Sequence, residues 1–329
     1  MPWLLAALLA IPLGLDLYLP VPDGNPLTAE KVDLGRRLFH DRRLSRDRTI
    51  SCASCHDPSR AFSSPRRVAV GVFGRIGRRN APALINRGYG RGFFWDGRIT
   101  TLEEQVLKPI EDPNEMDLPV LEAAARIGLS PTSLSHALAS YVRTILSGSS
   151  PYDRYINGDR SALSETQQAG LRVFRGKGNC TACHVGPTFS DERTHNTGAA
   201  WRPLTVREPQ GRPEPGRGTT GSGQAPSTGS GQAAFQDEGR FIVTGKTEDR
   251  GAFKTPTLRD VARTAPYMHD GHLATLDEVV KFYDEGGRAN PNLDPEIRPL
   301  RLTTAEKQAV VAFLKRLSGA SGAGSRSAP

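Results

Sequence analysis

The chain has 329 residues, of which 37% are hydrophobic, and a formal net charge of +8 at pH 7. This length allows two domains, and this hydrophobic content is enough to build their cores. The positive charge indicates an acidic partner or an anionic surface, or serves solubility alone. The uncharged and largely apolar run Met1–Leu15 is too short to predict a membrane span.

The N-terminal residues 1–19 are largely apolar, as in a signal for export or a membrane anchor. The first basic residue is Lys31, so the charged start of a signal peptide is missing, and no clear cleavage site of small residues follows. We therefore expect 1–19 to be a signal or a short uncleaved anchor.

Helical patterns dominate the rest of the chain, and long alternating strand patterns are absent. Segments 28–39 and 132–146 have helical spacing, and after Thr303 apolar residues recur at the same spacing. Four capping-box patterns predict helix starts, at Thr101–Glu104, Ser164–Gln167, Thr275–Glu278 and Thr303–Glu306. The predicted fold class is mostly α.

All four cysteines belong to two copies of the pentapeptide CxxCH. These are Cys52 and Cys55 with His56, and Cys180 and Cys183 with His184. The pattern predicts covalent c-type haem, with each histidine as the proximal iron ligand. A zinc site would favour CxxC pairs closer together in sequence, and neither zinc nor a redox dithiol explains a histidine after both pairs. Structural disulfides are the remaining alternative.

Each half of the chain holds one motif, so we expect two cytochrome c-like domains with one haem each. We place the first at 20–160 and the second at 161–318, with a flexible tail at 319–329. Within 208–232, 17 of 25 residues are Gly, Pro, Ser or Thr, which predicts a disordered insert in the second domain.

Several ordered motifs resemble those of the bacterial dihaem cytochrome c peroxidases and their relative MauG. Besides the two CxxCH pentapeptides they are Leu34–Phe39, Arg79–Pro82, Phe94–Arg98, Leu102–Gln105, Asn114–Met116, Phe253–Arg259 and Ala265–Gly271. The resemblance runs from about residue 20 to 318, except for the insert. It implies that the first haem reacts with peroxide and that the second receives or stores electrons.

The resemblance places Gln105 and Glu115 over the distal face of the first haem. Cleavage of a bound peroxide needs a proton moved from one oxygen to the other, which a carboxylate can take and return. Glu115 is thus the expected general acid/base, and Gln105 the group that orients the peroxide. Trp95 corresponds to the tryptophan that lies between the haems in the relatives and relays electrons.

Two further expectations also rest on the resemblance alone. Asn80, Thr264 and Pro266 match the positions that hold a calcium ion between the domains through one amide and two carbonyl oxygens. Many of the peroxidases have a histidine that blocks the first haem until the second is reduced. At the matching position this chain has Val72, which cannot bind iron.

The second haem has a methionine as its distal ligand in the peroxidases and a tyrosine in MauG. The matching residue here is Tyr283, which shares a predicted helix face with Leu276, Val279 and Val280. Met268 is the rival ligand, and a core tyrosine is the simpler alternative. A phenolate ligand stabilises ferric iron and favours a MauG-like branch, whereas Gly178 replaces the surface tryptophan of MauG.

Three functions follow from these residues. The first is reduction of hydrogen peroxide to water with electrons from a small periplasmic protein, a cytochrome c or a cupredoxin. The second is a MauG-like oxidation of side chains in a partner protein, and the third is a dihaem electron carrier or sensor. We expect a periplasmic protein, free or anchored to the inner membrane, with no nucleic acid partner; the resemblance allows a homodimer.

Overall fold

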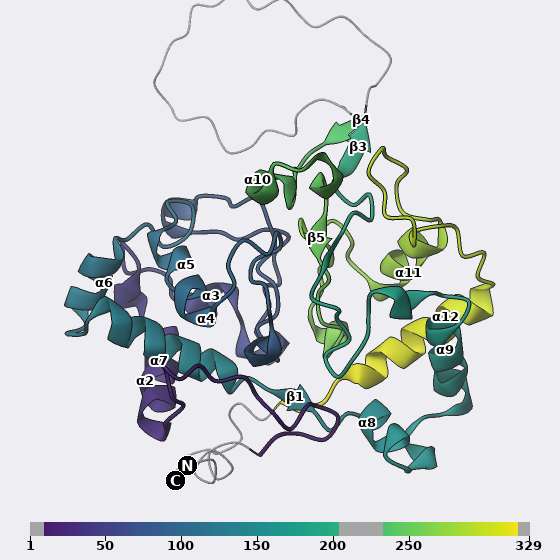
Figure 1. Cartoon of the computed structure of the whole chain (residues 1–329), viewed down its shortest axis with the longest axis horizontal. Coiled ribbons are helices and arrows are strands. Elements are labelled where there is room, and N and C mark those ends of the chain that lie inside the picture. Colours follow the sequence, from purple (N-terminus) through teal and green to yellow (C-terminus); the bar gives the residue numbers. More distant parts are fainter. Residues whose placement is uncertain (1–9, 204–232, 322–329) are drawn as a thin grey trace, which may run out of the picture.

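The computed structural model describes residues 10–203 and 233–321, which form two lobes (Figure 1). The first lobe is built from helices packed around one hydrophobic core. Its elements are α2 (Ala29–Phe39), η1 (Arg42–Leu44), α3 (Cys52–Cys55), η2 (Pro58–Arg60), η3 (Val72–Gly74), η4 (Arg87–Tyr89), α4 (Leu102–Gln105), α5 (Lys108–Glu111), α6 (Val120–Arg126) and α7 (Pro131–Arg143).

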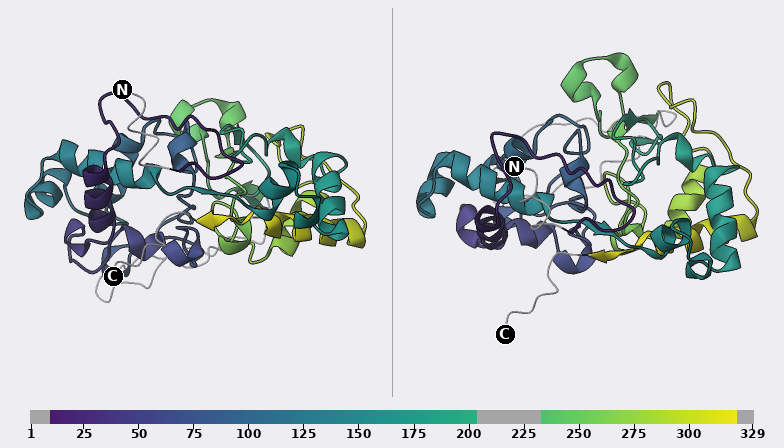
Figure 2. Two further views of the ribbon diagram at one scale, coloured as in Figure 1. Left: turned by 90° about the horizontal axis from the view of Figure 1, so that it is seen from below. Right: turned by 60° about the horizontal axis from the view of Figure 1, so that its bottom comes forward.

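The second lobe has its own core. Its helices are α8 (Pro151–Ile156), η5 (Arg160–Ala162), α9 (Glu165–Arg175), η6 (Cys180–Ala182), α10 (Phe241–Thr244), η7 (Thr247–Asp249), η8 (Val261–Arg263), α11 (Leu276–Asp284), α12 (Thr304–Leu314) and η9 (Lys315–Leu317). Turned views of the ribbon keep the helices of the two lobes apart (Figure 2). The described part of the chain is therefore mostly α, as the sequence predicts.

Each lobe contains a pair of helices that pack unusually close together, and the close contact has the same form in both lobes. In the first lobe, a Cβ on Gly35 of α2 would lie 1.9 Å from the backbone oxygen of Ala137 on α7. In the second, a Cβ on Gly170 of α9 would lie 1.9 Å from the backbone oxygen of Ala309 on α12. Only glycine allows the two backbones to approach so closely. This repeated contact makes the two lobes architecturally alike.

Short two-stranded sheets join segments far apart in sequence. β1 (Ser147–Gly148) pairs antiparallel with β6 (Ala320–Ser321), and β2 (Thr194–His195) pairs with β5 (Phe253–Lys254). β3 (Trp201–Pro203) pairs with β4 (Ala233–Phe235), so the two strands beside the predicted insert lie together (Figure 1). The insert itself, 208–232, lies outside the described residues.

The division between the lobes differs from the predicted boundary at residue 160. Tyr152 of α8 packs edge-on against Phe189 and Phe313, with ring centroids 5.1 and 5.7 Å apart. Helix α8 therefore belongs to the second core, and the change between cores falls between Ile145 and Pro151. The turn at Asn157–Gly158 suggested the later boundary. The packing of Tyr152, which precedes this turn, shows that the second lobe begins earlier.

Both chain ends contribute more structure than the sequence indicates. Leu15 and Leu19 are buried against Leu146, so residues 11–19 pack on the body of the protein. The expected tail from residue 319 is wrong for Ala320–Ser321, which pair with β1 because their backbone groups find partners there; 322–329 lie outside the described residues, as do 1–9. Among the helices that the structure describes, none has the length and apolar character needed to cross a membrane.

The predicted helix starts agree well with the structure. Thr28 caps α2, and full capping boxes open α9, α11 and α12 at Ser164, Thr275 and Thr303. At Thr101 the side chain accepts from the N–H of Glu104, which caps α4. The helix predicted at 132–146 is α7 and ends at Arg143.

Candidate active site

The first CxxCH motif starts at helix α3 and ends at its C-cap. Cys52 and Cys55 lie one helical turn apart, and His56 follows directly. The Nδ1 atom of His56 lies 3.0 Å from the backbone oxygen of Phe62. A donated hydrogen bond from Nδ1 fixes the ring and leaves Nε2 available for a metal. Burial lowers the pKa of His56, which favours the neutral form that binds iron.

The second motif repeats this arrangement on η6. The Nδ1 atom of His184 lies 2.8 Å from the backbone oxygen of Phe189. Burial lowers the pKa of this histidine as well. All four cysteines are free thiols in the structure, which argues against the disulfide alternative. Two CxxCH motifs, each with a histidine whose Nδ1 atom lies against a nearby backbone oxygen, fit two covalent haems.

One connected cavity of about 2780 Å³ takes lining residues from both lobes. It reaches His56 and Cys55 of the first motif and His184, Cys180 and Cys183 of the second. Such a volume exceeds the few hundred to about 1,000 Å³ of an ordinary ligand pocket. Its size and its lining therefore suit two large planar groups.

Glu115 and Gln105 line this cavity in the first lobe, together with His56. Gln105 ends α4, and Glu115 follows α5 in the loop at 112–117. Burial, and then the charge of Asp112, raise the pKa of Glu115 to about 7, while Arg98 opposes the shift. Burial raises the pKa of Cys55, and the negative charge of Glu115 raises it further. Glu115 therefore lies near the first motif, with a carboxyl group that can gain and lose a proton at neutral pH.

Val72, the residue at the blocking position, is fully buried in η3 and does not line the cavity. The next residue, Phe73, lines the cavity instead and is 61% exposed. Among the cavity-lining residues of the first lobe that the structure describes, His56 and Cys55 are the only His, Cys, Met or Tyr. That part of the cavity thus offers a single axial ligand.

Trp95 connects the two lobes through Asn80. Its indole N–H donates to the backbone oxygen of Asn80, 2.8 Å away, and the N–H of Asn80 donates to the backbone oxygen of His269, 2.6 Å away. The backbone oxygen of Trp95 accepts from the N–H of Lys254 at 2.7 Å. Trp95 therefore lies at the junction of the lobes and lines the shared cavity.

The three residues of the expected calcium site also line the cavity: Asn80, Thr264 and Pro266. The Nδ2 group of Asn80 donates to the backbone oxygen of Arg66 at 2.8 Å, which leaves its Oδ1 atom to face a ligand. The Oγ1 group of Thr264 donates to Val261, so only its carbonyl would be offered to a cation. Calcium here stays a prediction.

Tyr283 lies in the second lobe beside the second motif. It lines the cavity with Leu276, Val279 and Val280, the residues expected on the same face of α11. Burial, followed by the charges of Cys183 and Cys180, raises the pKa of Tyr283. Met268 lines the cavity too, with a backbone φ of 72°. Both candidate ligands are thus present, and Tyr283 is the one placed near both cysteines.

A family model described as di-haem cytochrome c peroxidase matches residues 29–132. A cytochrome-c peroxidase named IdrP1 from Denitromonas iodatirespirans is 37% identical, with 93% of this chain and 86% of that protein covered. The methylamine utilization protein MauG of Methylorubrum extorquens is also 37% identical, over 91% and 81%. The crystal structure of a MauG-like protein associated with microbial copper homeostasis superposes with a TM-score of 0.76, at 32% identity and 93% and 95% coverage.

The chain belongs to the dihaem cytochrome c peroxidase/MauG family. It is an oxidoreductase that acts on peroxide, and its cofactors are haems of the c type. The six residues of the two CxxCH motifs stay the predicted attachment sites of these haems.

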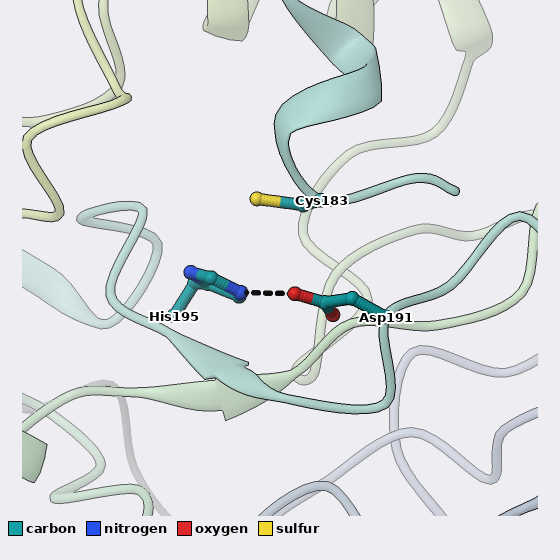
Figure 3. Close-up of side chains that lie close together, drawn as sticks. All are labelled: Cys183, Asp191 and His195. Atoms are coloured by element: carbon teal, nitrogen blue, oxygen red, sulfur yellow. Dashed lines mark hydrogen bonds and ion pairs between the residues drawn. The ribbon is translucent and has the colours of Figure 1, made fainter. Parts of the chain in front are cut away.

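Cys183, Asp191 and His195 form a group that sequence reasoning missed (Figure 3). Their ligand atoms lie within 4.8 Å of one another, as in a metal site. His195 contacts Asp191 at 2.9 Å and Asp294 at 2.6 Å. Hydrogen bonds to Cys183, Asp294 and Asp191 raise the pKa of His195 to about 10. Because a c-type haem takes the Cys183 sulfur into a thioether, we assign this group to the haem surroundings and not to a separate metal.

A second missed feature is the ion-pair network of Arg79. Its guanidinium contacts Asp96 of the first lobe at 2.6 Å and Asp237 of the second at 2.7 Å. Arg79 opens the Arg79–Pro82 motif, but its partner Asp237 is 158 residues away. The network holds the two lobes together next to Trp95.

Proposed function

We propose that this protein reduces hydrogen peroxide to water with electrons from a small periplasmic redox protein, either a cytochrome c or a cupredoxin. The reaction consumes one peroxide, two electrons and two protons and yields two waters. The observation that carries the proposal is the shared cavity at the first motif. There Glu115 and Gln105 line the cavity together with His56, and the described lining residues of the first lobe include no other His, Met or Tyr.

Haem iron bound through His56 would supply an open coordination position and one-electron redox chemistry. Glu115 then accepts the proton of the arriving peroxide and returns it to the departing oxygen. A carboxyl group whose pKa lies near 7 is suited to both transfers at neutral pH. Gln105 orients the peroxide by hydrogen bonding, and Trp95 relays electrons from the second lobe.

The second motif serves electron entry in this proposal, with Tyr283 or Met268 as the distal ligand of its haem. Each lobe then holds one haem, in a first domain up to about residue 146 and a second from about 150. A calcium ion held by Asn80, Thr264 and Pro266 would stabilise the junction through which electrons pass. Covalent haem attachment supports the periplasm as the location of the protein in this proposal.

A stoichiometric assay tests this function. The reduced donor, first a cytochrome c and then a cupredoxin, is mixed with the dihaem protein and a limiting amount of peroxide. We expect two donor molecules to be oxidised per peroxide consumed. Peroxide loss without donor oxidation, or no loss at all, would contradict the proposal.

MauG-like oxidation of a partner protein is the second candidate, and Tyr283 is the observation that favours it. A phenolate ligand lowers the potential of the second haem and makes it a poor acceptor from ordinary cytochromes. Gly178 weighs against it because this position carries no side chain to relay electrons to a surface-bound protein. Incubating a partner protein with peroxide and the enzyme, followed by mass spectrometry of its tyrosines and tryptophans, separates the two candidates.

A further inference from the structure

A cluster of charged side chains lines the cavity in the second lobe, away from Glu115. It contains Arg202 of β3, Asp270 and His272 in the loop before α11, and Arg288 after α11. One carboxylate thus faces two guanidinium groups and an imidazole. No role in the chemistry proposed above uses any of these four residues.

One ring nitrogen of His272 is hydrogen-bonded, and the other has no hydrogen-bond partner among the described residues. Its Nδ1 atom lies 2.6 Å from Oδ1 of Asp270, and its side chain is only 8% exposed. The Nε2 atom is buried and has no hydrogen-bond partner among the described residues. A buried polar atom without a partner is costly, by about 1–3 kcal/mol. We therefore expect the Nε2 atom of His272 to bind a group from a ligand.

Arg202 also has one hydrogen-bonded nitrogen atom and one buried nitrogen atom without a described partner. Its Nη2 group pairs with Oδ2 of Asp270, while its Nε atom is buried without a partner in the described part of the chain. Asp270 thus fixes both His272 and Arg202 and leaves one nitrogen atom of each unused. Two fixed nitrogen atoms next to an excess of positive charge suit an anion with two oxygens.

The cluster lies beside the helix that carries Tyr283. The ring of His272 meets the ring of Phe282 edge-on, with centroids 6.3 Å apart, and the guanidinium of Arg288 lies 5.9 Å from the same ring. Phe282 directly precedes Tyr283 on α11. The anion that fits the cluster would therefore be close to the haem of the second motif.

We propose that Arg202 and His272, with Arg288 beside them, bind a propionate carboxylate of the haem attached to Cys180 and Cys183. The Nε–H of Arg202 and the Nε2–H of His272 donate to the carboxylate, and Asp270 holds both side chains in place. This site rests on the second haem and does not depend on which electron donor is used. Compensation of the propionate charge disfavours ferric iron and holds the haem potential up.

Potentiometric titration of the dihaem protein tests this site without any peroxide. His272→Leu and Arg202→Met should each lower the potential of the second haem. The expected size is a roughly tenfold rise in its oxidised-to-reduced ratio at a fixed applied potential, or 59 mV for one electron. The first haem should keep its potential. His272→Gln, whose amide can replace the Nε2–H, should keep most of the native value.

Lys281→Gln is the matched control, because it removes a positive charge from the outer side of α11, where Lys281 is 68% exposed. It should leave both potentials unchanged. Native potentials in both His272→Leu and Arg202→Met would overturn the proposal. If His272→Leu does not bind haem, Arg202→Met is tested by resonance Raman spectroscopy. Propionate modes that are unchanged from the wild type would overturn the proposal.

Two other outcomes would also exclude propionate binding. Conversion of the second haem to high spin in His272→Leu would make His272 an iron ligand. A saturable shift of the wild-type potential on addition of acetate would show that the site takes an external carboxylate. Failure of peroxide turnover, by contrast, would bear only on the proposed function.

Discussion

The backbone N–H of Val72 donates a hydrogen bond to the backbone oxygen of Glu115, 2.8 Å away. The loop that carries a blocking histidine in many relatives is thus tied here to the proposed acid/base. Gly71 makes this contact possible, since its backbone lies directly against the loop at 112–117. The position of Glu115 therefore depends on residues that do not touch the peroxide.

Gly71→Ala should lower peroxide turnover without loss of haem. A Cβ on Gly71 would lie 2.1 Å from the backbone oxygen of Asn114 and 2.5 Å from that of Glu115, so the two loops must separate. Overpacking of this kind costs about 1–3 kcal/mol of stability, and a displacement of about 1 Å can cost roughly 100-fold in rate. Steady-state kinetics and thermal unfolding measure both effects. Gly24→Ala, where a Cβ meets nothing within 4 Å, is the control; native turnover in Gly71→Ala would show that this contact does not position Glu115.

Glu115→Gln should keep both haems and lose at least about 100-fold in kcat/KM for peroxide, as expected for a general acid/base. The amide preserves shape but cannot accept the proton. Glu111→Gln removes a carboxylate from the exposed face of α5 and serves as the control. A loss of less than about threefold in Glu115→Gln would refute the assigned role.

The pH dependence of kcat/KM should report the ionisation of Glu115. Its pKa is raised to about 7, and the carboxylate form must accept the proton, so activity should rise as the pH passes through about 7 and fall below it. Because the charge of Asp112 contributes to this raised pKa, Asp112→Asn should move the midpoint to lower pH. An unchanged midpoint in Asp112→Asn, or a flat profile from about pH 5 to 8, would speak against Glu115.

Tyr283→Phe should convert the second haem from low to high spin, because the phenolate ligand is removed. Tyr152→Phe makes the same chemical change in the same lobe, but Tyr152 packs against Phe313 outside the cavity lining and should leave the spectrum unchanged. Electron paramagnetic resonance and optical spectra compare the two variants. A native spectrum in Tyr283→Phe would indicate Met268 as the ligand and an ordinary peroxidase.

The sequence predicts the parts of this structure that depend on local chemistry. The caps at Ser164, Thr275 and Thr303 satisfy backbone groups within a few residues, so their helices could be placed beforehand. The CxxCH motifs are equally local. The role of Glu115 could be expected only through the family resemblance, since an isolated glutamate in a loop carries no such signal.

Long-range relationships could not be predicted. Arg79 and Asp237, or His195 and Asp294, meet only because two lobes or distant loops pack together. The resemblance assigns Val72 to the blocking position, but its burial depends on the η3 turn and on its hydrogen bond to Glu115, which the sequence does not reveal. The missing hydrogen-bond partner of His272 Nε2 can be recognised only from the three-dimensional arrangement of Asp270 and the surrounding side chains.

Electron paramagnetic resonance of the fully oxidised dihaem protein, as isolated, decides whether the first haem is open to peroxide. The described lining near Glu115 offers His56 as its single axial ligand, and Val72 cannot provide another. We therefore expect one high-spin signal from the first haem and one low-spin signal from the second, before any reduction. Two low-spin signals with no high-spin component would contradict an open peroxide site at Glu115.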